Sequence, residues 1–269
     1  MKATRYIIYG ILLLAVIGLL CYYAFWEKDL SGTNILKVVL ILAGLIVDMI
    51  KNAKGSVPAN KKAFYLKAYG EFLQGAFAED TKLEKQLLSA VHDFAQSRFP
   101  SALSKLEKLR PHCQRTADLY AVTFFQGLCC DDLGLYQEAA DHYQAAASMK
   151  HNSTVCSNLG LCLQKLGKFE DAEKAYKEAI SIDAKNIYAL NNLSVLYFRR
   201  GEYETSLELS RQALEIDSGM VQALSNAALC CALTGRQEEY ESFYRRAVSN
   251  GYDGRKIKNT LRMMAEEEE

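Results

Sequence analysis

Residues 158–179 read N-L-G-L-C-L-Q-K-L-G-K-F-E-D-A-E-K-A-Y-K-E-A, and parts of this stretch return at a fixed interval along the chain. Gly134, Gly167, Gly201 and Gly235 follow one another at a nearly constant spacing of about 34 residues. A period of this length is typical of proteins in which each repeat is one pair of helices that cannot bury its apolar face alone. The sequence therefore predicts an all-α fold, a solenoid of stacked helix pairs.

Small and aromatic residues keep the same interval as these glycines. Gly160 and Ala179 stand where two helices must approach closely, and Tyr176 fills the gap between successive pairs. Gly167 and its repeats end the first helix of each pair, where a left-handed glycine closes the helix without steric strain. We therefore expect each unit to be a helix, a tight glycine turn and a second helix.

With Ala172 added, this set of residues resembles the tetratricopeptide repeat (TPR). The resemblance is good over residues 120–252 and poor over residues 83–119, where we expect a degenerate unit. The family's opening tryptophan and closing proline are missing from every unit, and Ser206 and Ser210 replace an alanine and an aromatic residue. The resemblance implies an all-α, TPR-like α-solenoid of four clear helix-pair repeats plus a degenerate one. It also implies that the first helices line a concave groove.

Two apolar stretches lie in the first 50 residues. Residues 6–26 carry no charge and, at about 1.5 Å per residue, form a helix of roughly 31 Å, which is long enough to cross a bilayer. Residues 35–50 are shorter and carry Lys37 and Asp48 near their ends, where both side chains can snorkel outward. The sequence predicts an N-terminal transmembrane helical hairpin, residues 1–50. For the second stretch an interfacial or re-entrant helix, or a helix packed on the repeats, stays open.

The placement of lysine and arginine predicts the orientation of this hairpin. Lys2 and Arg5 precede the first stretch and four lysines follow the second, whereas the loop 27–34 has one lysine against two acids. Positive residues stay on the cytoplasmic side, so we expect a two-pass protein of the cell membrane with its repeats on the cytoplasmic side. A cleaved signal peptide fits less well, because the apolar run is long and no small-residue cleavage site follows it.

Composition shifts divide the rest of the chain into four parts. Residues 51–62 combine glycine, serine, proline and lysine, and they read as a linker along an anionic membrane surface or as a solvated charge run. Residues 63–119 are a helical segment with the degenerate repeat, and residues 120–252 are the TPR repeats. Residues 253–269 are expected to form a C-terminal capping helix with an acidic tail.

Composition and motifs argue against an enzyme. Acidic and basic residues balance at 32 each, so no basic field indicates nucleic acid. The eight cysteines include adjacent pairs such as Cys129 and Cys130 but no zinc knuckle, and we expect them to be reduced and packed as small apolar residues. His112 and Cys113 are chain neighbours, a poor arrangement for a catalytic dyad. No phosphate-binding loop or metalloprotease motif is present. We therefore expect no catalysis, no cofactor, no metal and no small-molecule substrate.

A row of asparagines is the sharpest functional signal. Asn158, Asn192 and Asn226 occupy the same position of the first helix in three consecutive units. A carboxamide offers both a donor and an acceptor, so it can pair with the peptide units of a ligand. In related repeat proteins this position faces the groove, and we predict a ladder that holds a peptide backbone. Asparagine is also common at this position in repeats of every kind, which is the alternative interpretation.

The family register places further residues in the same groove. The predicted peptide-binding groove, beyond the three asparagines, consists of Leu161, Lys165, Tyr188, Asn191, Val195, Phe198, Arg199, Gln222 and Leu229. One family variant clamps a terminal carboxylate with basic residues on the first helices. The other clamp positions here hold Thr154, Ser157, Tyr188 and Asn191, so such a clamp is not predicted.

Two functions of different classes follow from these features. The first is a membrane-anchored scaffold or adaptor whose cytoplasmic groove binds an extended peptide or helix of a protein partner, while the N-terminal helices contact the lipid bilayer. The second is a structural or assembly subunit of a larger membrane protein complex. Tethering to a membrane raises the local concentration of a binding module and requires no chemistry from it.

Overall fold

The computed structural model describes residues 69–267. The membrane hairpin predicted for residues 1–50 and the linker at 51–62 lie outside the described residues. Within residues 69–267, no helix combines the length and the apolar character that a membrane crossing needs.

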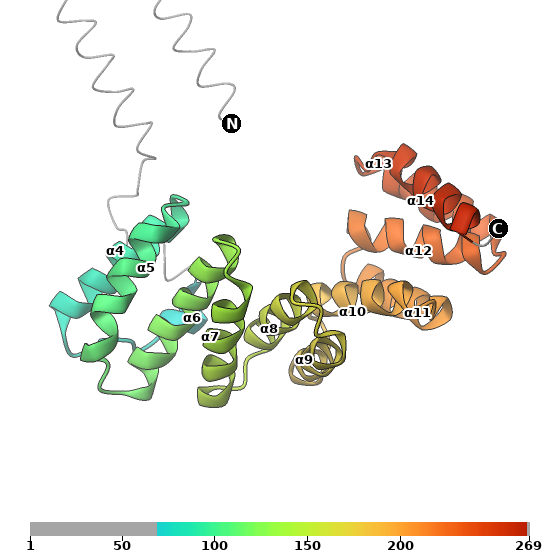
Figure 1. The fold of residues 1–269 in the computed structure, drawn as a ribbon. Coiled ribbons are helices and arrows are strands. Elements are labelled where there is room, and N and C mark those ends of the chain that lie inside the picture. The colour runs from blue at the N-terminus through green and yellow to red at the C-terminus, as the bar shows by residue number, and fades with distance from the viewer. Residues whose placement is uncertain (1–68, 268–269) are drawn as a thin grey trace, which may run out of the picture. The chain divides into compact units, whose positions relative to one another are not determined.

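Every regular element of the described part of the chain is helical, as the repeat period predicts (Figure 1). After a short helical stretch at residues 69–73, the elements follow in pairs and end in a single helix. In chain order they are α4 (Thr81–Ala95), α5 (Phe99–Leu109), η1 (Arg110–His112), α6 (Thr116–Asp132), α7 (Tyr136–Met149), α8 (Ser153–Lys165), α9 (Phe169–Ile182), α10 (Ile187–Arg199), α11 (Tyr203–Ile216), α12 (Val221–Leu233), α13 (Gln237–Ser249) and α14 (Gly254–Glu267).

Glycine turns separate the two helices of each clear pair. Gly134, Gly167, Gly201 and Gly235 have φ between 72° and 78°, the left-handed region that a side chain disfavours. At the other end of the unit, Asn152 and Asn186 start the first helices α8 and α10, and each side chain accepts a hydrogen bond from a backbone N–H in the first turn. The glycine turns confirm the predicted helix–turn–helix unit.

The degenerate unit is also a helix pair, α4 and α5, but its turn has no glycine. Ser97 takes the left-handed position, with φ at 57°. The buried carboxylate of Asp93 accepts hydrogen bonds from Arg98 and Ser101 and pairs with Lys105 at 2.6 Å. Burial alone would raise the pKa of Asp93, but the hydrogen bonds from Lys105, Ser101 and Arg98 hold it well below its usual range. These polar contacts stabilise a turn that lacks the glycine of the later units.

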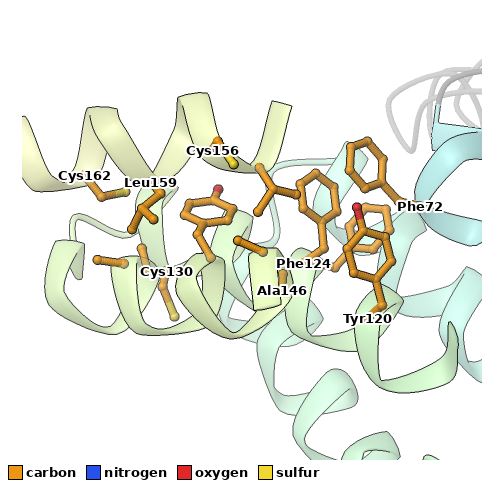
Figure 2. Close-up of a cluster of buried hydrophobic side chains, with 14 of the residues drawn as sticks. Phe72, Tyr120, Phe124, Cys130, Ala146, Cys156, Leu159 and Cys162 are labelled. Carbon is orange, nitrogen blue, oxygen red and sulfur yellow. The ribbon is translucent and has the colours of Figure 1, made fainter. Parts of the chain in front are cut away.

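Small residues let the helices approach, as the sequence predicts. A Cβ atom at Gly160 would lie 2.7 Å from the ring of Tyr176, and one at Gly127 would lie 2.8 Å from the ring of Tyr143. The buried apolar side chains of successive units therefore form one continuous core, and part of it is shown in Figure 2. Six of the seven described cysteines are buried, four in this core and two in a second cluster toward the C-terminus, and none of the seven forms a disulfide. They pack as small apolar side chains.

Candidate functional site

The first helices of the repeats form one side of the array. α8 contacts α10, and α10 contacts α12, in addition to the contacts each makes with its own second helix. Helices of neighbouring units can touch in this way only on the side where the stack is tightest. The first helices therefore line the inner face, where the sequence places the groove.

A hollow of about 280 Å³ lies on this face between the N-terminal halves of α8 and α10, and we call it the Tyr188 pocket. It brings together two residues of the predicted groove, Asn158 and Tyr188. Tyr188 is 67% exposed, an unusual fraction for a large aromatic side chain without a partner. The pocket is lined by Thr154, Ser157, Asn158, Asp183, Lys185, Asn186, Ile187 and Tyr188.

Hydroxyl and amide groups dominate the polar lining of the Tyr188 pocket. Thr154, Ser157 and Asn158 come from one face of α8, at the spacing that places residues on neighbouring turns of a helix. Farther along α10, Asn191 is only 7% exposed, and its Oδ1 atom has no hydrogen-bond partner. Its Nδ2 atom donates to Asn192 at 3.4 Å. A buried carbonyl oxygen without a donor is unfavourable, so Asn191 is a polar group that the contacts of the fold leave partly unsatisfied.

The three asparagines do not form the uniform ladder that the sequence predicts. Asn158 and Asn192 are half-buried, and each amide acts on the hydroxyl of a tyrosine in the preceding second helix. Burial raises the pKa of these tyrosines, Tyr143 and Tyr176, and the asparagine amides oppose that shift. The two amides therefore lie close to the second helix of the preceding unit, and Asn158 also lines the Tyr188 pocket.

Asn226 departs furthest from the prediction, because it is buried. Its exposed fraction is 5%, and Nδ2 donates to the hydroxyls of Ser194, Ser206 and Ser210 at 2.9–3.0 Å. Ser210 stands where Tyr143 and Tyr176 stand in earlier units, and the smaller side chain leaves room for the amide. Asn226 is thus a structural residue of the junction between α10 and α12, which we call the third junction, and it is buried where the sequence predicts a groove residue.

A second hollow, also of about 280 Å³, lies at the opposite ends of α8 and α10, and we call it the Arg199 pocket. Arg199 is exposed and makes no ion pair with any described residue. Its counterpart one unit earlier, Lys165, pairs with Asp131 at 2.9 Å, so the structure uses that predicted groove residue within the fold. The Arg199 pocket is lined by Gln164, Phe169, Glu170, Leu196, Arg199 and Arg200.

The other predicted groove residues lie on the first helices but outside the two pockets. Leu161, Val195, Phe198 and Leu229 are half-buried, and Gln222 is exposed. Phe198 packs against Tyr203 of α11, the second helix of its own unit, with ring centroids 5.5 Å apart.

Asp183, Lys185 and Asn186 are among the lining residues of the Tyr188 pocket that were not predicted. They belong to the loop between α9 and α10, which the helix register does not cover. One signal was available, because Asn152 and Asn186 stand at the same position of two successive units and an asparagine before an apolar helix indicates an N-cap. A position next to the start of a groove helix is close to any ligand of that groove.

An apolar hollow of about 470 Å³ lies between the second helices α9 and α11, over α10. Its apolar lining comes from Ile180, Leu193, Tyr197 and Leu209, and the sequence did not predict it. Thr205 and Gln212 also line it, but its surface is mainly apolar, whereas the surface of the Tyr188 pocket is nearly half polar; the Tyr188 pocket remains the candidate site.

Comparisons with known proteins agree with the repeats. Two models of the tetratricopeptide repeat match residues 153–186 and 187–216, the two units that meet at the Tyr188 pocket. The chain therefore carries TPR repeats. A comparison with curated proteins gives no match.

Solved structures with the same fold share little sequence with this chain. The crystal structure of MamA is 17% identical with a TM-score of 0.55, and the alignment covers 60% of this chain and 93% of MamA. YrrB, described as a TPR protein with an unusual peptide-binding site, is 17% identical with a TM-score of 0.55, over 77% of this chain and 100% of YrrB. A TPR protein from Parabacteroides merdae is 21% identical with a TM-score of 0.55, over 62% and 66%. These likenesses concern the fold alone.

Proposed function

We propose that the chain is a membrane-anchored interaction protein, a scaffold or adaptor whose inner face binds an extended segment of a partner protein between α8 and α10. The observation that carries this proposal is the Tyr188 pocket, where hydroxyl and amide side chains converge beside an exposed aromatic ring. The TPR fold supports protein or peptide partners in general, and YrrB, a similar structure, is described as having a peptide-binding site.

The chemistry of the pocket suits a polypeptide. Thr154, Ser157 and Asn158 supply donors and acceptors that match the N–H and C=O groups of an extended backbone. Tyr188 adds a large and rigid apolar surface with a polar end, a combination that is common where binding energy is concentrated. The pocket is open and pre-formed, so a partner segment can bind without reorganising the repeats.

The neighbouring junctions favour the centre of the array as the binding place. At the first junction, between α6 and α8, the chain's own Phe72 covers Phe124, with ring centroids 3.6 Å apart. At the third, between α10 and α12, Met220 occupies the position equivalent to Asn186 and is buried. The junction between α8 and α10 is hollow at both ends.

The apolar stretches at residues 6–26 and 35–50, together with the lysines that follow them, support the rest of the proposal. The protein is then a two-pass protein of the cell membrane with the repeats in the cytoplasm. Protease digestion of intact cells tests this arrangement, because the repeats are expected to be protected until the membrane is opened. Digestion of the repeats in intact cells would refute it.

Site-specific photo-cross-linking in membranes tests the binding function. A photoreactive residue in place of Tyr188 is expected to give a discrete adduct with a partner protein. The same residue in place of Thr205, which lines the hollow between α9 and α11, serves as the control and is expected to give none. Adducts at 205 alone would contradict the proposal and favour an assembly subunit that packs through its outer helices.

A blocking substitution makes the same test specific to the pocket. Thr154 is exposed, so Thr154→Arg fills the pocket without disturbing the core and is expected to remove the adduct at position 188. Thr205→Arg, at an exposed position of the outer hollow, is the matched control and is expected to leave the adduct unchanged.

A further inference from the structure

Three positions near the end of each first helix can be compared from unit to unit. At the first junction, between α6 and α8, two of them form an ion pair and the third supplies an aromatic ring. Lys165, at the end of α8, contacts Asp131, at the end of α6, with 2.9 Å between Nζ and Oδ1. The same ammonium lies 4.4 Å from the ring centroid of Tyr136, at the start of α7. A carboxylate of the chain itself thus neutralises a cation held over an aromatic ring.

At the middle junction the cation and the ring recur but the carboxylate does not. One unit further along the chain, the positions of Asp131, Lys165 and Tyr136 are occupied by Gln164, Arg199 and Phe169. Gln164 is neutral, and its Oε1 atom accepts a hydrogen bond from Tyr176. Arg199 is left without an ion pair to any described residue, Phe169 is 39% exposed, and the space between them is the Arg199 pocket.

The other charges at this pocket do not replace the missing carboxylate. Glu170 lies 3.9 Å from Arg200, and Arg200 also pairs with Glu173, so these charges balance one another. At the third junction the positions become apolar, with Phe198 and Leu233 in place of the charged pair and Tyr203 in place of the ring. Of the three junctions, the middle one is therefore where these three positions keep a cation that has no ion pair to a described residue, next to the Arg199 pocket.

We propose that the Arg199 pocket binds an aspartate or glutamate side chain of the partner segment, whose carboxylate takes the place that Asp131 occupies one unit earlier. The inference rests on the proposed function, because it assigns chemistry to the same ligand. A guanidinium is a planar, permanently charged donor that holds a carboxylate through two parallel hydrogen bonds. Phe169 supplies an apolar surface for the methylene groups of the acidic side chain.

The spacing of the two pockets fixes where this acidic residue stands in the partner. Tyr188 and Arg199 are eleven residues apart on α10, which is about 16 Å along a helix. An extended chain covers that distance in about five residues at roughly 3.3 Å each. The partner segment then carries an acidic residue about five positions from the residue that binds beside Tyr188.

A small carboxylate tests the pocket independently of the unknown partner. The probe is N-acetyl-aspartate N-methylamide, and its neutral counterpart is N-acetyl-asparagine N-methylamide, which has nearly the same shape. The full-length chain is labelled at leucine methyl groups, and the resonance of Leu196, which lines the pocket, is followed during titration. We expect saturable binding of the aspartate probe that is about three-fold tighter than that of the asparagine probe, the size of a partly exposed ion pair.

Substitutions at Arg199 and Gln164 test whether the preference for aspartate depends on the cation and on the missing carboxylate. Arg199→Gln removes the cation, and Gln164→Asp restores the internal carboxylate of the earlier unit, so both are expected to abolish the preference for aspartate. Lys165→Gln, which removes a neighbouring cation that does not line the pocket, is the matched control and is expected to keep it. Equal binding of the two probes, no saturable binding, or tighter binding of N-acetyl-alanine through its terminal carboxylate would each overturn the inference.

The outcome is separable from that of the proposed function. Tyr188→Ala leaves the Arg199 pocket intact, so it is expected to keep the aspartate preference while it weakens capture of the partner. Adducts at position 188 without any aspartate preference would overturn this inference and leave the proposed function standing. An aspartate preference without adducts at position 188 would overturn the proposed function.

Discussion

The junctions on the two sides of α8 are built from the same kind of helix pairs, but the inner face of one is covered by another segment of the chain and that of the other is open. On the α6 side, the leading segment (residues 69–77) covers the inner face, and Phe72 lies against Phe124 and Tyr120 (Figure 2). The carboxylate of Glu71 accepts a hydrogen bond from Asn152 at 3.1 Å. On the α10 side, no described segment covers the equivalent positions, and the Tyr188 pocket is open.

This difference shows that one scaffold supplies both a closed and an open junction. The helix pairs pack alike on both sides, because Gly127 and Gly160 receive Tyr143 and Tyr176 in the same way. What changes is the lining, since Phe124 at the first junction becomes Ser157 at the second. In a solenoid each unit contacts only its neighbours, so one junction can specialise in stability and the next in binding.

Removing the ring of Phe72 is the strongest way to break this comparison. Phe72→Ala is expected to lower the free energy of unfolding by about 3–4 kcal/mol, because it leaves a cavity beside Phe124 and Tyr120. Tyr188→Ala, the matched aromatic truncation at the open junction, is expected to change it by less than about 0.5 kcal/mol. Urea unfolding of the full-length chain, followed by helical circular dichroism, measures both. Equal losses would show that the second junction also depends on its aromatic residue.

The sequence predicts the frame of both junctions because the frame repeats. A glycine such as Gly167 needs a left-handed turn, and Gly160 needs a close helix crossing, wherever the unit occurs. These demands are local and recur from unit to unit, so the period alone reveals the helix pairs and their turns. Tyr188 and Arg199 could be placed on the inner face by the same register.

What the sequence does not reveal depends on contacts that do not repeat. The leading segment reaches Asn152 from a distant part of the chain, and no periodic signal announces that contact. The burial of Asn226 depends on Ser206 and Ser210, which the sequence shows only as departures from the family pattern. Taken together, a small residue in place of an aromatic one and a nearby asparagine indicate a polar cluster in the core.

A second prediction contrasts the asparagines of the open and the third junctions. Asn226→Ala is expected to lower the free energy of unfolding by about 2 kcal/mol, because it removes a buried amide that donates to three buried serine hydroxyls. Asn158→Ala, at the wall of the Tyr188 pocket, is expected to cost less than about 1 kcal/mol, since it is half-buried and makes fewer contacts. Urea unfolding of both variants measures the difference. Combining Asn226→Ala with Ser206→Ala is expected to give less than the sum of the two losses. Strict additivity would contradict the cluster.

A third prediction concerns the polar contacts that join α9 to α10 at the open junction, between α8 and α10. Glu173 on α9 accepts hydrogen bonds from Tyr197 of α10 and from Arg200, the residue after α10, and it pairs with Lys177 at 2.7 Å. The hydrogen bond from Lys177, opposed by burial and reinforced by Tyr197 and Arg200, lowers the pKa of Glu173 from 4.5 to about 2. The stabilisation is therefore fully present above pH 4.5 and is lost as the pH falls toward 2.

Comparison with Glu173→Gln measures that contribution. At pH 7 the variant is expected to be less stable by about 1 kcal/mol, a value discounted for the partial exposure of the group. The difference in free energy of unfolding between the two proteins is expected to shrink as the pH falls from 4.5 toward 2. A difference that stays constant over this range would show that the carboxylate charge is not what joins α9 to α10.

The smallest expected effect is at the ion pair that closes the first junction, between Asp131 and Lys165. Asp131→Asn is expected to lower the free energy of unfolding by only about 0.5 kcal/mol, because the pair is partly exposed and screened by water. A double-mutant cycle with Lys165→Met isolates the coupling, which is expected to weaken further at high salt. A coupling above about 2 kcal/mol would mean that the ion pair stabilises this end of the first junction far more than a partly exposed pair should. The Arg199 pocket at the open junction would then result from the loss of one carboxylate at Gln164, and Gln164→Asp alone would be enough to close that pocket.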